Sequence, residues 1–220
     1  MNKEAEKYLI TLSDPRSPVS EAYRTLRTNL SFYSLDNPLR TLVVTSPAAD
    51  DGKSTTVANL AVTMAQSGRK TILVDCDLRR PSLHTFFGLP AEPGLTNMLL
   101  DDDEPPLQET GVENLWLLAS GPKPPNPADL LGARKVDRVI ERLKEMADVI
   151  LFDAPPVVAV TDAAVLGAKV DGVLLVISAG KTRREHAERA KELLQKAHVR
   201  LVGVTLTNAP KDDAISGYYG

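Results

Sequence analysis

The chain has little that would hold it together or anchor it other than a packed core. Its 220 residues include one cysteine, Cys76, which excludes an intrachain disulfide and any CxxC metal or cluster site within one chain. The longest apolar runs, such as 173–177, are about five residues, whereas a bilayer-spanning helix needs roughly 20. The first residues show no apolar core and no cleavage site, so no secretory signal is predicted. We therefore expect a cytoplasmic protein that reaches the inner face of the membrane only through a partner.

The chain also has little excess of charge of either sign. The 26 basic and 29 acidic residues leave a net charge of −3, so no global field attracts nucleic acid or anionic lipid. Hydrophobic residues make up 43% of the chain, which is ordinary for a globular domain. A chain of this length buries enough surface to be stable without a disulfide or metal.

Short β-branched runs define the expected fold. They lie at 41–45, 71–75, 149–153, 173–178 and 201–207. Their hydrophobicity is continuous rather than alternating, which indicates parallel strands covered on both faces. The stretches between them are mostly long enough for helices, as at 54–67, and a further helical run at 21–32 precedes the first strand. The sequence therefore predicts an α/β fold, a doubly wound and mostly parallel sheet flanked by helices.

A phosphate-binding loop follows the first predicted strand directly. The segment SPAADDGKST at 46–55 stands between that strand and a helix. Backbone N–H groups and the positive helix end would surround a β-phosphate, Lys53 would bridge the β- and γ-phosphates, and Ser54 would ligate Mg²⁺. Three residues, Gly-Lys-Ser, would be common by chance, but strand, loop and helix together favour a P-loop. Pro47 replaces its first glycine.

Two carboxylates within the loop are unusual. Asp50 and Asp51 would repel phosphate charge if they faced it. We expect both side chains to turn outward, away from the nucleotide.

Three aspartates stand at the ends of hydrophobic strands. Asp75 and Asp77 end the second strand, and Asp153 ends the third. Neighbouring parallel strands open on one crevice at their carboxyl ends, so all three can face the P-loop. Burying them requires cations, which Lys53 and Mg²⁺ would supply. An aspartate also often ends a strand as a turn former or cap, but three beside a P-loop favour a phosphoryl-transfer site.

These segments, together with three others, resemble one known family, the bacterial tyrosine kinases of capsule and exopolysaccharide synthesis. The resemblance spans essentially the whole chain. It rests on EAYRTLR at 21–27, which fits the family's Glu-x-x-Arg-x-x-Arg oligomerisation motif, on the P-loop, on LVDCDLR at 73–79, which is similar to its Walker A-prime motif, on Asp153 at the Walker B position, on GPKPPNP at 121–127, and on tyrosines near the C-terminus.

The resemblance implies a P-loop NTPase of the partitioning-ATPase-like type that uses ATP and Mg²⁺ to phosphorylate tyrosine. By position, Lys53, Asp75, Asp77 and Asp153 are the implied catalytic residues, and Ser54, Asp77 and Asp153 the implied metal ligands. Asp75 or Asp77 would contact the phenol, mainly to orient it, because a carboxylate of pKa about 4 is a weak base toward a phenol of pKa about 10. The implied nucleotide-binding residues are Ala49, Asp50, Asp51, Gly52, Lys53, Ser54, Thr55 and Asn208. For Asn208, a capping or turn role is an equal alternative.

The resemblance also implies partners. Glu21, Arg24 and Arg27 would form the subunit contacts of a ring-shaped homo-oligomer; intrahelical i,i+3 ion pairing is the simpler alternative. The activator would be the cytoplasmic tail of a transmembrane polysaccharide co-polymerase. The acceptors would be Tyr218 and Tyr219 of a neighbouring subunit. The expected organisation is a linker at 1–17, a kinase domain at 18–210 and a flexible tail at 211–220.

Two departures from the family keep other functions open. The family's P-loop usually carries Pro-Gly-Glu-Gly before its lysine, where this chain has ADDG at 49–52, and its tyrosine cluster is usually longer. A non-catalytic, nucleotide-binding scaffold of an export assembly is one alternative. A partitioning-type ATPase switch is another, although such proteins place a second lysine where this chain has Ala48.

Overall fold

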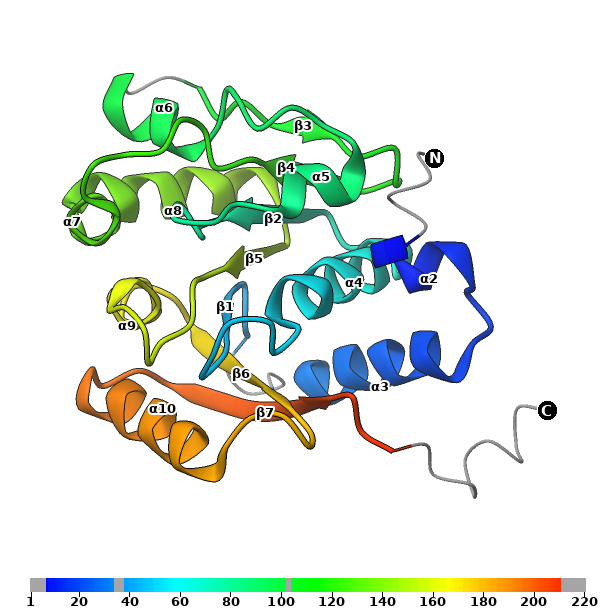
Figure 1. The fold of residues 1–220 in the computed structure, drawn as a ribbon. Coiled ribbons are helices and arrows are strands. Elements are labelled where there is room, and N and C mark those ends of the chain that lie inside the picture. The colour runs from blue at the N-terminus through cyan, green and yellow to red at the C-terminus, as the bar shows by residue number, and fades with distance from the viewer. Residues whose placement is uncertain (1–6, 34–37, 102–103, 211–220) are drawn as a thin grey trace.

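The fold is a single seven-stranded sheet with helices on both faces (Figure 1). A computed structural model describes residues 7–33, 38–101 and 104–210. The strand order is β3-β4-β2-β5-β1-β6-β7, and every ladder is parallel except β3 with β4. The strands are β1 (Thr41–Thr45), β2 (Thr71–Asp75), β3 (Gln108–Glu109), β4 (Leu115–Leu118), β5 (Val149–Asp153), β6 (Gly172–Ser178) and β7 (Leu201–Thr207). The predicted doubly wound, mostly parallel sheet is confirmed.

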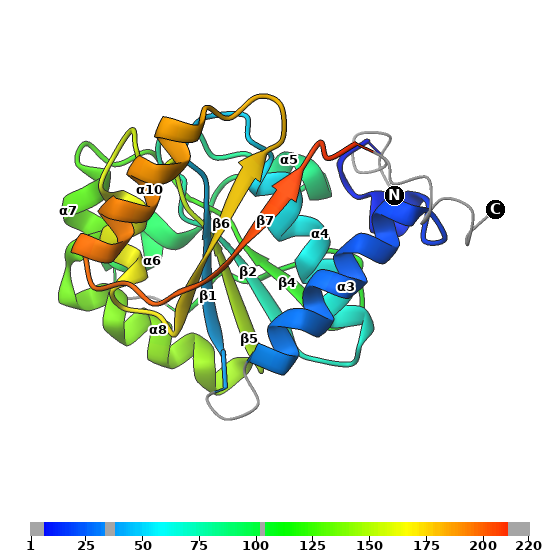
Figure 2. The same ribbon diagram turned by 90° about the horizontal axis from the view of Figure 1, so that it is seen from below.

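Helices cover each face of the sheet and create two hydrophobic cores (Figure 2). One core lies under α8, α9 and α10, and the other under α3 and α4. Every residue of β1, β2 and β5 is buried, which is why these strands read as continuous apolar runs. The helices are α2 (Ile10–Ser13), α3 (Pro18–Tyr33), α4 (Lys53–Gln66), α5 (Leu83–Phe87), α6 (Leu95–Asp101), α7 (Pro127–Gly132), α8 (Arg134–Met146), α9 (Asp162–Gly167) and α10 (Arg184–Lys196).

The strand order determines where a ligand site forms. β5 lies between β1 and β2, although β1 and β2 are neighbours in sequence. In the register of these strands, Asp153 of β5 pairs with Val44 of β1 on one side and with Asp75 of β2 on the other. The carboxyl ends of the three strands therefore meet at one point, where the chain reverses its winding direction and α/β sheets usually bind ligands.

The N-terminal segment packs against the helices α3 and α4 earlier in the chain than the sequence suggests. Although a polar linker is predicted at 1–17, Leu9 is only 1% exposed and Thr11 is fully buried. Both lie in the region where α2 contacts α3 and α4. Within the described part of the chain, no helix has the length and apolar character needed to cross a bilayer.

Candidate nucleotide and phosphoryl-transfer site

The loop between β1 and α4 has the backbone conformation of a phosphate cradle. Gly52 has a φ of 91° and immediately precedes the first helical residue, Lys53. A Cβ on Gly52 would also lie 3.2 Å from the Thr207 side chain, so both conformation and space favour glycine. Asp50 has a φ of 59°, a left-handed conformation that aspartate tolerates better than most residues. The position that carries glycine in the family pattern thus keeps a glycine-like conformation here.

The expected outward orientation is wrong for Asp51. Asp50 is exposed, but Asp51 is only 1% exposed and its side chain turns into the protein. Its Oδ2 atom accepts a hydrogen bond from the Ala48 N–H at 2.9 Å, and its Oδ1 atom accepts one from the Thr182 hydroxyl at 2.8 Å. These donors hold the carboxylate in place, and Asp51 stabilises the loop from inside.

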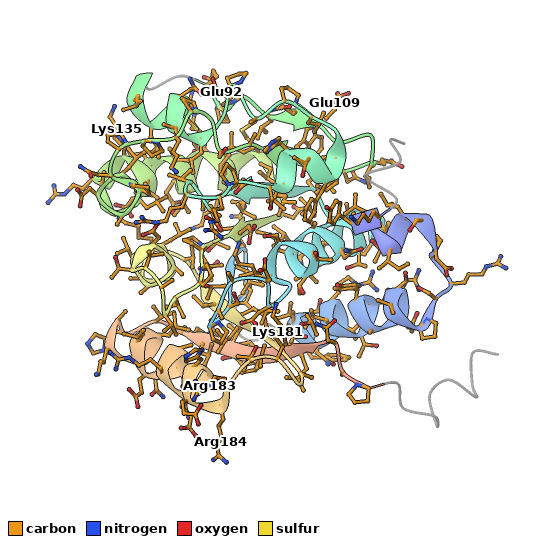
Figure 3. All side chains as sticks on the ribbon, in the orientation of Figure 1. Glu92, Glu109, Lys135, Lys181, Arg183 and Arg184 are labelled. Carbon is orange, nitrogen blue, oxygen red and sulfur yellow. The ribbon has the colours of Figure 1, made fainter. Side chains whose placement is uncertain are left out.

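Two further segments, the loop between β6 and α10 and the end of β7, anchor the P-loop. Lys181 donates from Nζ to the Asp50 carbonyl at 2.9 Å, and the Thr207 hydroxyl donates to the Asp51 carbonyl at 2.7 Å. Sequence analysis missed Lys181, Thr182 and Thr207, because contacts across more than 130 positions leave no local pattern. Figure 3 shows Arg184 projecting outward from the start of α10. Lys181 and Thr182 therefore brace the P-loop, whereas Arg184, a few residues later, faces solvent.

Lys53 joins the strand ends into one charged cluster. Its Nζ atom lies 2.9 Å from Asp77 Oδ2, 3.1 Å from Asp153 Oδ1 and 3.0 Å from Ser54 Oγ. Ser54 in turn donates to Asp153 Oδ2 at 2.5 Å. Burial by itself lowers the pKa of Lys53, but the charges of Asp153 and Asp77 outweigh it, so the pKa is raised. Burial raises the pKa of Asp153, and Lys53 and Ser54 oppose that rise. The cluster has one ammonium for several carboxylates and so favours an added cation.

Asp75 is placed differently from Asp77. Asp75 is fully buried, and its oxygens accept hydrogen bonds from the backbone N–H groups of Asp77 at 3.2 Å and of Ser82 and Leu83 at 3.0 Å. Burial first, and then the charge of Asp153, raises the pKa of Asp75 to about 7. Asp77 instead keeps a side chain that is 7% exposed. Asp77 accepts one backbone hydrogen bond, from the Arg80 N–H to Oδ1 at 3.0 Å. The structure thus distinguishes a fully buried carboxyl held by three backbone donors from one that pairs with Lys53 and keeps a small exposed surface.

Two neighbouring residues in the same segment are structural. Cys76 is buried, and desolvation together with the charge of Asp75 raises the pKa of its thiol well above the usual value, which disfavours a reactive thiolate. Arg79 makes a two-pronged ion pair with the buried Asp162, from Nε to Oδ2 at 2.9 Å and from Nη2 to Oδ1 at 3.0 Å. This pair connects the segment after β2 to α9.

The other predicted site residues are only partly gathered here. Ala49, Thr55 and Asn208 lie in or beside the P-loop; Asn208 has a φ of 52° and donates to Ser178 Oγ at 2.9 Å, and the chain bends there just after β7. An adenine contact for Asn208 stays a prediction. Tyr218 and Tyr219 lie outside the described residues.

The predicted oligomerisation residues make contacts within the chain. Arg24 pairs with Glu21 at 2.9 Å, the i,i+3 arrangement, and also donates to the Pro15 carbonyl. Arg27 donates to the Thr63 carbonyl of α4 at 3.0 Å. The helix that carries the motif is therefore tied to the helix that follows the P-loop.

The oxygen atoms of this cluster suit magnesium. Mg²⁺ prefers oxygen ligands and is usually held by one or two carboxylates together with phosphates and water. Ser54 Oγ lies 2.5 Å from Asp153 Oδ2, and Asp77 Oδ2 lies 2.9 Å from the Lys53 ammonium that also contacts Asp153. No group of three or more His, Cys, Asp or Glu side chains in the described residues is arranged to hold a metal alone. A magnesium ion here would therefore depend on bound phosphate.

Comparison with known proteins agrees with this geometry. The family model described as "ParA: NUBPL iron-transfer P-loop NTPase" matches residues 39–208, so the chain has the fold and phosphate loop of that class. It is 43% identical over 219 residues to the tyrosine-protein kinase YwqD of Bacillus subtilis (strain 168), covering 98% of this chain and 92% of YwqD. The chain belongs to the bacterial tyrosine-kinase family.

Solved structures support the same assignment. The chimerical protein CapA2B2 matches with a TM-score of 0.89 at 37% identity, over 93% of this chain and 91% of that one. The kinase domain of the Escherichia coli tyrosine kinase ETK matches with a TM-score of 0.88 at 31% identity, over 94% and 82%.

Proposed function

We propose that this protein transfers the γ-phosphoryl group of ATP to Tyr218 and Tyr219 of a neighbouring subunit, and that this modification regulates capsular or exopolysaccharide synthesis and export. The observation that carries the proposal is the position of Lys53, between Asp77 and Asp153 at the meeting point of three strand ends. In a member of a tyrosine-kinase family, this is the charge arrangement that phosphoryl transfer requires.

The chain's own residues would act in sequence. The ammonium of Lys53 exchanges carboxylate contacts for phosphate oxygens, which releases Asp77. Ser54 and Asp153, with Asp77, would hold Mg²⁺, which neutralises phosphate charge when bound. The phenol oxygen forms a bond to the γ-phosphorus as the bond between that phosphorus and the bridging oxygen breaks, and ADP leaves. The phenol proton departs late, toward Asp77 or water.

Asp77 is the better candidate for the phenol contact. Its side chain keeps a small exposed surface of 7%. It would also lose its ion pair when the Lys53 ammonium turns to bound phosphate. Asp75 has no exposed surface, and three backbone N–H groups occupy its oxygens. We assign Asp75 the role of positioning the segment that carries Asp77.

The proposed assembly includes a ring of identical subunits, with Glu21, Arg24 and Arg27 at the contacts, and a transmembrane polysaccharide co-polymerase as activator. Placement at the inner face of the membrane would follow from that partner. The intrachain bond of Arg27 to Thr63 links the proposed contact helix to α4, the helix that follows the P-loop.

The proposal is tested by intact-mass spectrometry after incubation with ATP and Mg²⁺, alone and with an activating partner fragment. We expect phosphate on Tyr218 or Tyr219 in the wild type, none in Lys53→Met, and none on the tail of a Tyr218→Phe/Tyr219→Phe variant. ATP hydrolysis without tyrosine modification would favour the ATPase switch. Nucleotide binding without either reaction would favour the scaffold.

A further inference from the structure

The first described residues form a strap over the helix that follows the P-loop. Residues 7–13, here called the N-terminal strap, include the short helix α2, which lies beside α4 (Figure 1). Leu9 is 1% exposed and Thr11 is fully buried. A helix of four residues has no stability of its own, so the position of the strap depends on what it contacts.

One buried amide connects the strap to the P-loop helix. Asn59 of α4 is fully buried. Its Oδ1 atom accepts from the Thr11 N–H at 3.1 Å and from the Thr11 hydroxyl at 2.9 Å. Its Nδ2 atom donates to the Tyr8 carbonyl at 2.8 Å and to the Thr55 carbonyl at 2.9 Å. All four hydrogen-bonding positions of the amide are in use, and Thr55 is the second residue after Lys53. Asn59 therefore joins the strap to the turn that would hold the phosphates.

The strap also contacts α5, the helix that follows the turn after β2. The ring of Tyr8 stacks on Phe86 of α5, with centroids 4.3 Å apart and planes 1° from parallel. The N–H groups of Ser82 and Leu83, just before and at the start of α5, hold Asp75. The strap thus bridges the helix that follows the P-loop and the turn that holds Asp75.

We propose that docking of the N-terminal strap and binding of nucleotide are coupled, with Asn59 as the positioning residue that couples them. Nucleotide at the P-loop would hold the strap in place, and release of the strap would weaken nucleotide binding by the same factor, because such coupling is reciprocal. A partner or preceding segment acting on the strap would in this way adjust the site without entering it. This inference rests on the proposed function only in taking the P-loop as the nucleotide site.

The first test uses Thr11→Val, which keeps the shape of the side chain but removes the hydroxyl that donates to Asn59. Thr28→Val is the matched control, because the Thr28 hydroxyl is exposed on α3 and bonds only to the Arg24 carbonyl of its own helix. Affinity for Mg·ADP is measured by calorimetry at a temperature where all variants are folded. We expect the Kd to rise about five-fold or more in Thr11→Val, the lower end of allosteric couplings, and to be unchanged in Thr28→Val. A merely structural contact would lower the free energy of unfolding without changing the Kd of the folded protein.

The second test needs no variant. Amide hydrogen exchange of residues 9–13 is measured in the wild type with and without saturating Mg·ADP, and we expect slower exchange when nucleotide is present. An unchanged exchange rate overturns the coupling, as does an unchanged Kd in Thr11→Val. If the wild type takes up no Mg·ADP, the proposed nucleotide site and the coupling both fail; normal uptake without coupling overturns this inference alone.

Discussion

The Nζ atom of Lys53 lies 2.9 Å from Oδ2 of Asp77, so the residue that would bind phosphate is paired with the residue proposed to receive the phenol. The same ammonium lies 3.1 Å from Asp153. All three groups are nearly or fully buried, which makes each carboxylate costly without its cation. Nucleotide binding must therefore exchange one set of anions around Lys53 for another, and the protein without nucleotide depends on Lys53 for stability.

The dependence of the fold on Lys53 can be measured. Lys53→Met leaves Asp77 and Asp153 without their cation, and we expect the free energy of unfolding at pH 8 to fall by about 3 kcal/mol. Adding Asp77→Asn should restore part of the loss, because one of the uncompensated charges is gone. Urea unfolding of the two single variants and the double variant completes the cycle. Additive effects would show that the pair does not interact as the distances indicate.

Asp75 predicts a specific pH dependence. Its pKa of about 7 in the folded protein lies above the ordinary value of 3.8, so ionisation costs more in the folded state than in the unfolded state. The wild type therefore loses stability through this residue as the pH rises from about 4 to about 7, and the loss stays constant above that range. Asp75→Asn has no charge to bury, so its stability relative to the wild type should increase across the same interval.

Thermal unfolding of both proteins from pH 4 to 9 checks this, with phosphate transfer measured in parallel. We expect Asp75→Asn to lose activity, and its stability relative to the wild type to rise between about pH 4 and pH 7 and to stay constant above pH 7. A stability difference that does not change with pH would contradict the burial of an ionisable Asp75.

Much of the fold was predictable because buried parallel strands carry a local signal. The continuous apolar runs located β1, β2, β5 and β7 at their observed limits, and the aspartates at their ends do share one crevice. The orientation of Asp51 was not predictable. It depends on Thr182, 131 positions away, and no local pattern marks a contact of that kind. For the same reason the sequence showed nothing of the bonds from Asn59 to the N-terminal strap.

Substitutions of the loop residue Asp50 can separate the effect of its charge on nucleotide affinity from the effect of its backbone conformation. The repulsion between an exposed carboxylate and one phosphate charge about 8 Å away is about 0.5 kcal/mol in a dielectric near that of water. Asp50→Asn removes the charge but keeps a residue that tolerates a φ of 59°. We expect it to bind Mg·ADP two- to three-fold more tightly at low salt, and Asp50→Gly to bind at least as tightly.

Calorimetry at two salt concentrations checks this prediction, because the gain should shrink as salt screens the charge. Asp50→Ala is the conformational control, since it removes the charge but disfavours the left-handed backbone, and should be less stable than Asp50→Gly. If Asp50→Asn gained no affinity at low salt, the carboxylate would lie farther from the phosphates than the loop geometry implies.

Thr182 should control nucleotide affinity from outside the P-loop. Its hydroxyl donates to the buried Asp51 carboxylate at 2.8 Å and accepts from the Ser178 N–H at 2.9 Å. Thr182→Val can do neither, so a buried carboxylate loses a donor and a backbone N–H loses its acceptor, at a cost of about 1–3 kcal/mol. Asp51 would then be free to leave the position that keeps its charge away from the phosphates. We expect the KM for ATP to rise several-fold in Thr182→Val.

Matched variants show whether a rise in KM comes from loss of the Thr182 hydroxyl or from a change in side-chain shape. Thr182→Ser keeps the hydroxyl and should retain most of the affinity, whereas Thr85→Val, which removes an exposed hydroxyl on α5, should behave as the wild type. Initial rates of tail phosphorylation over a range of ATP concentrations separate KM from kcat. Because Thr182 touches neither the phenol nor the aspartates at the strand ends, the change should fall mainly on KM. An equal loss in Thr182→Val and Thr182→Ser would mean that the side chain supports the P-loop by its shape and not through the hydroxyl.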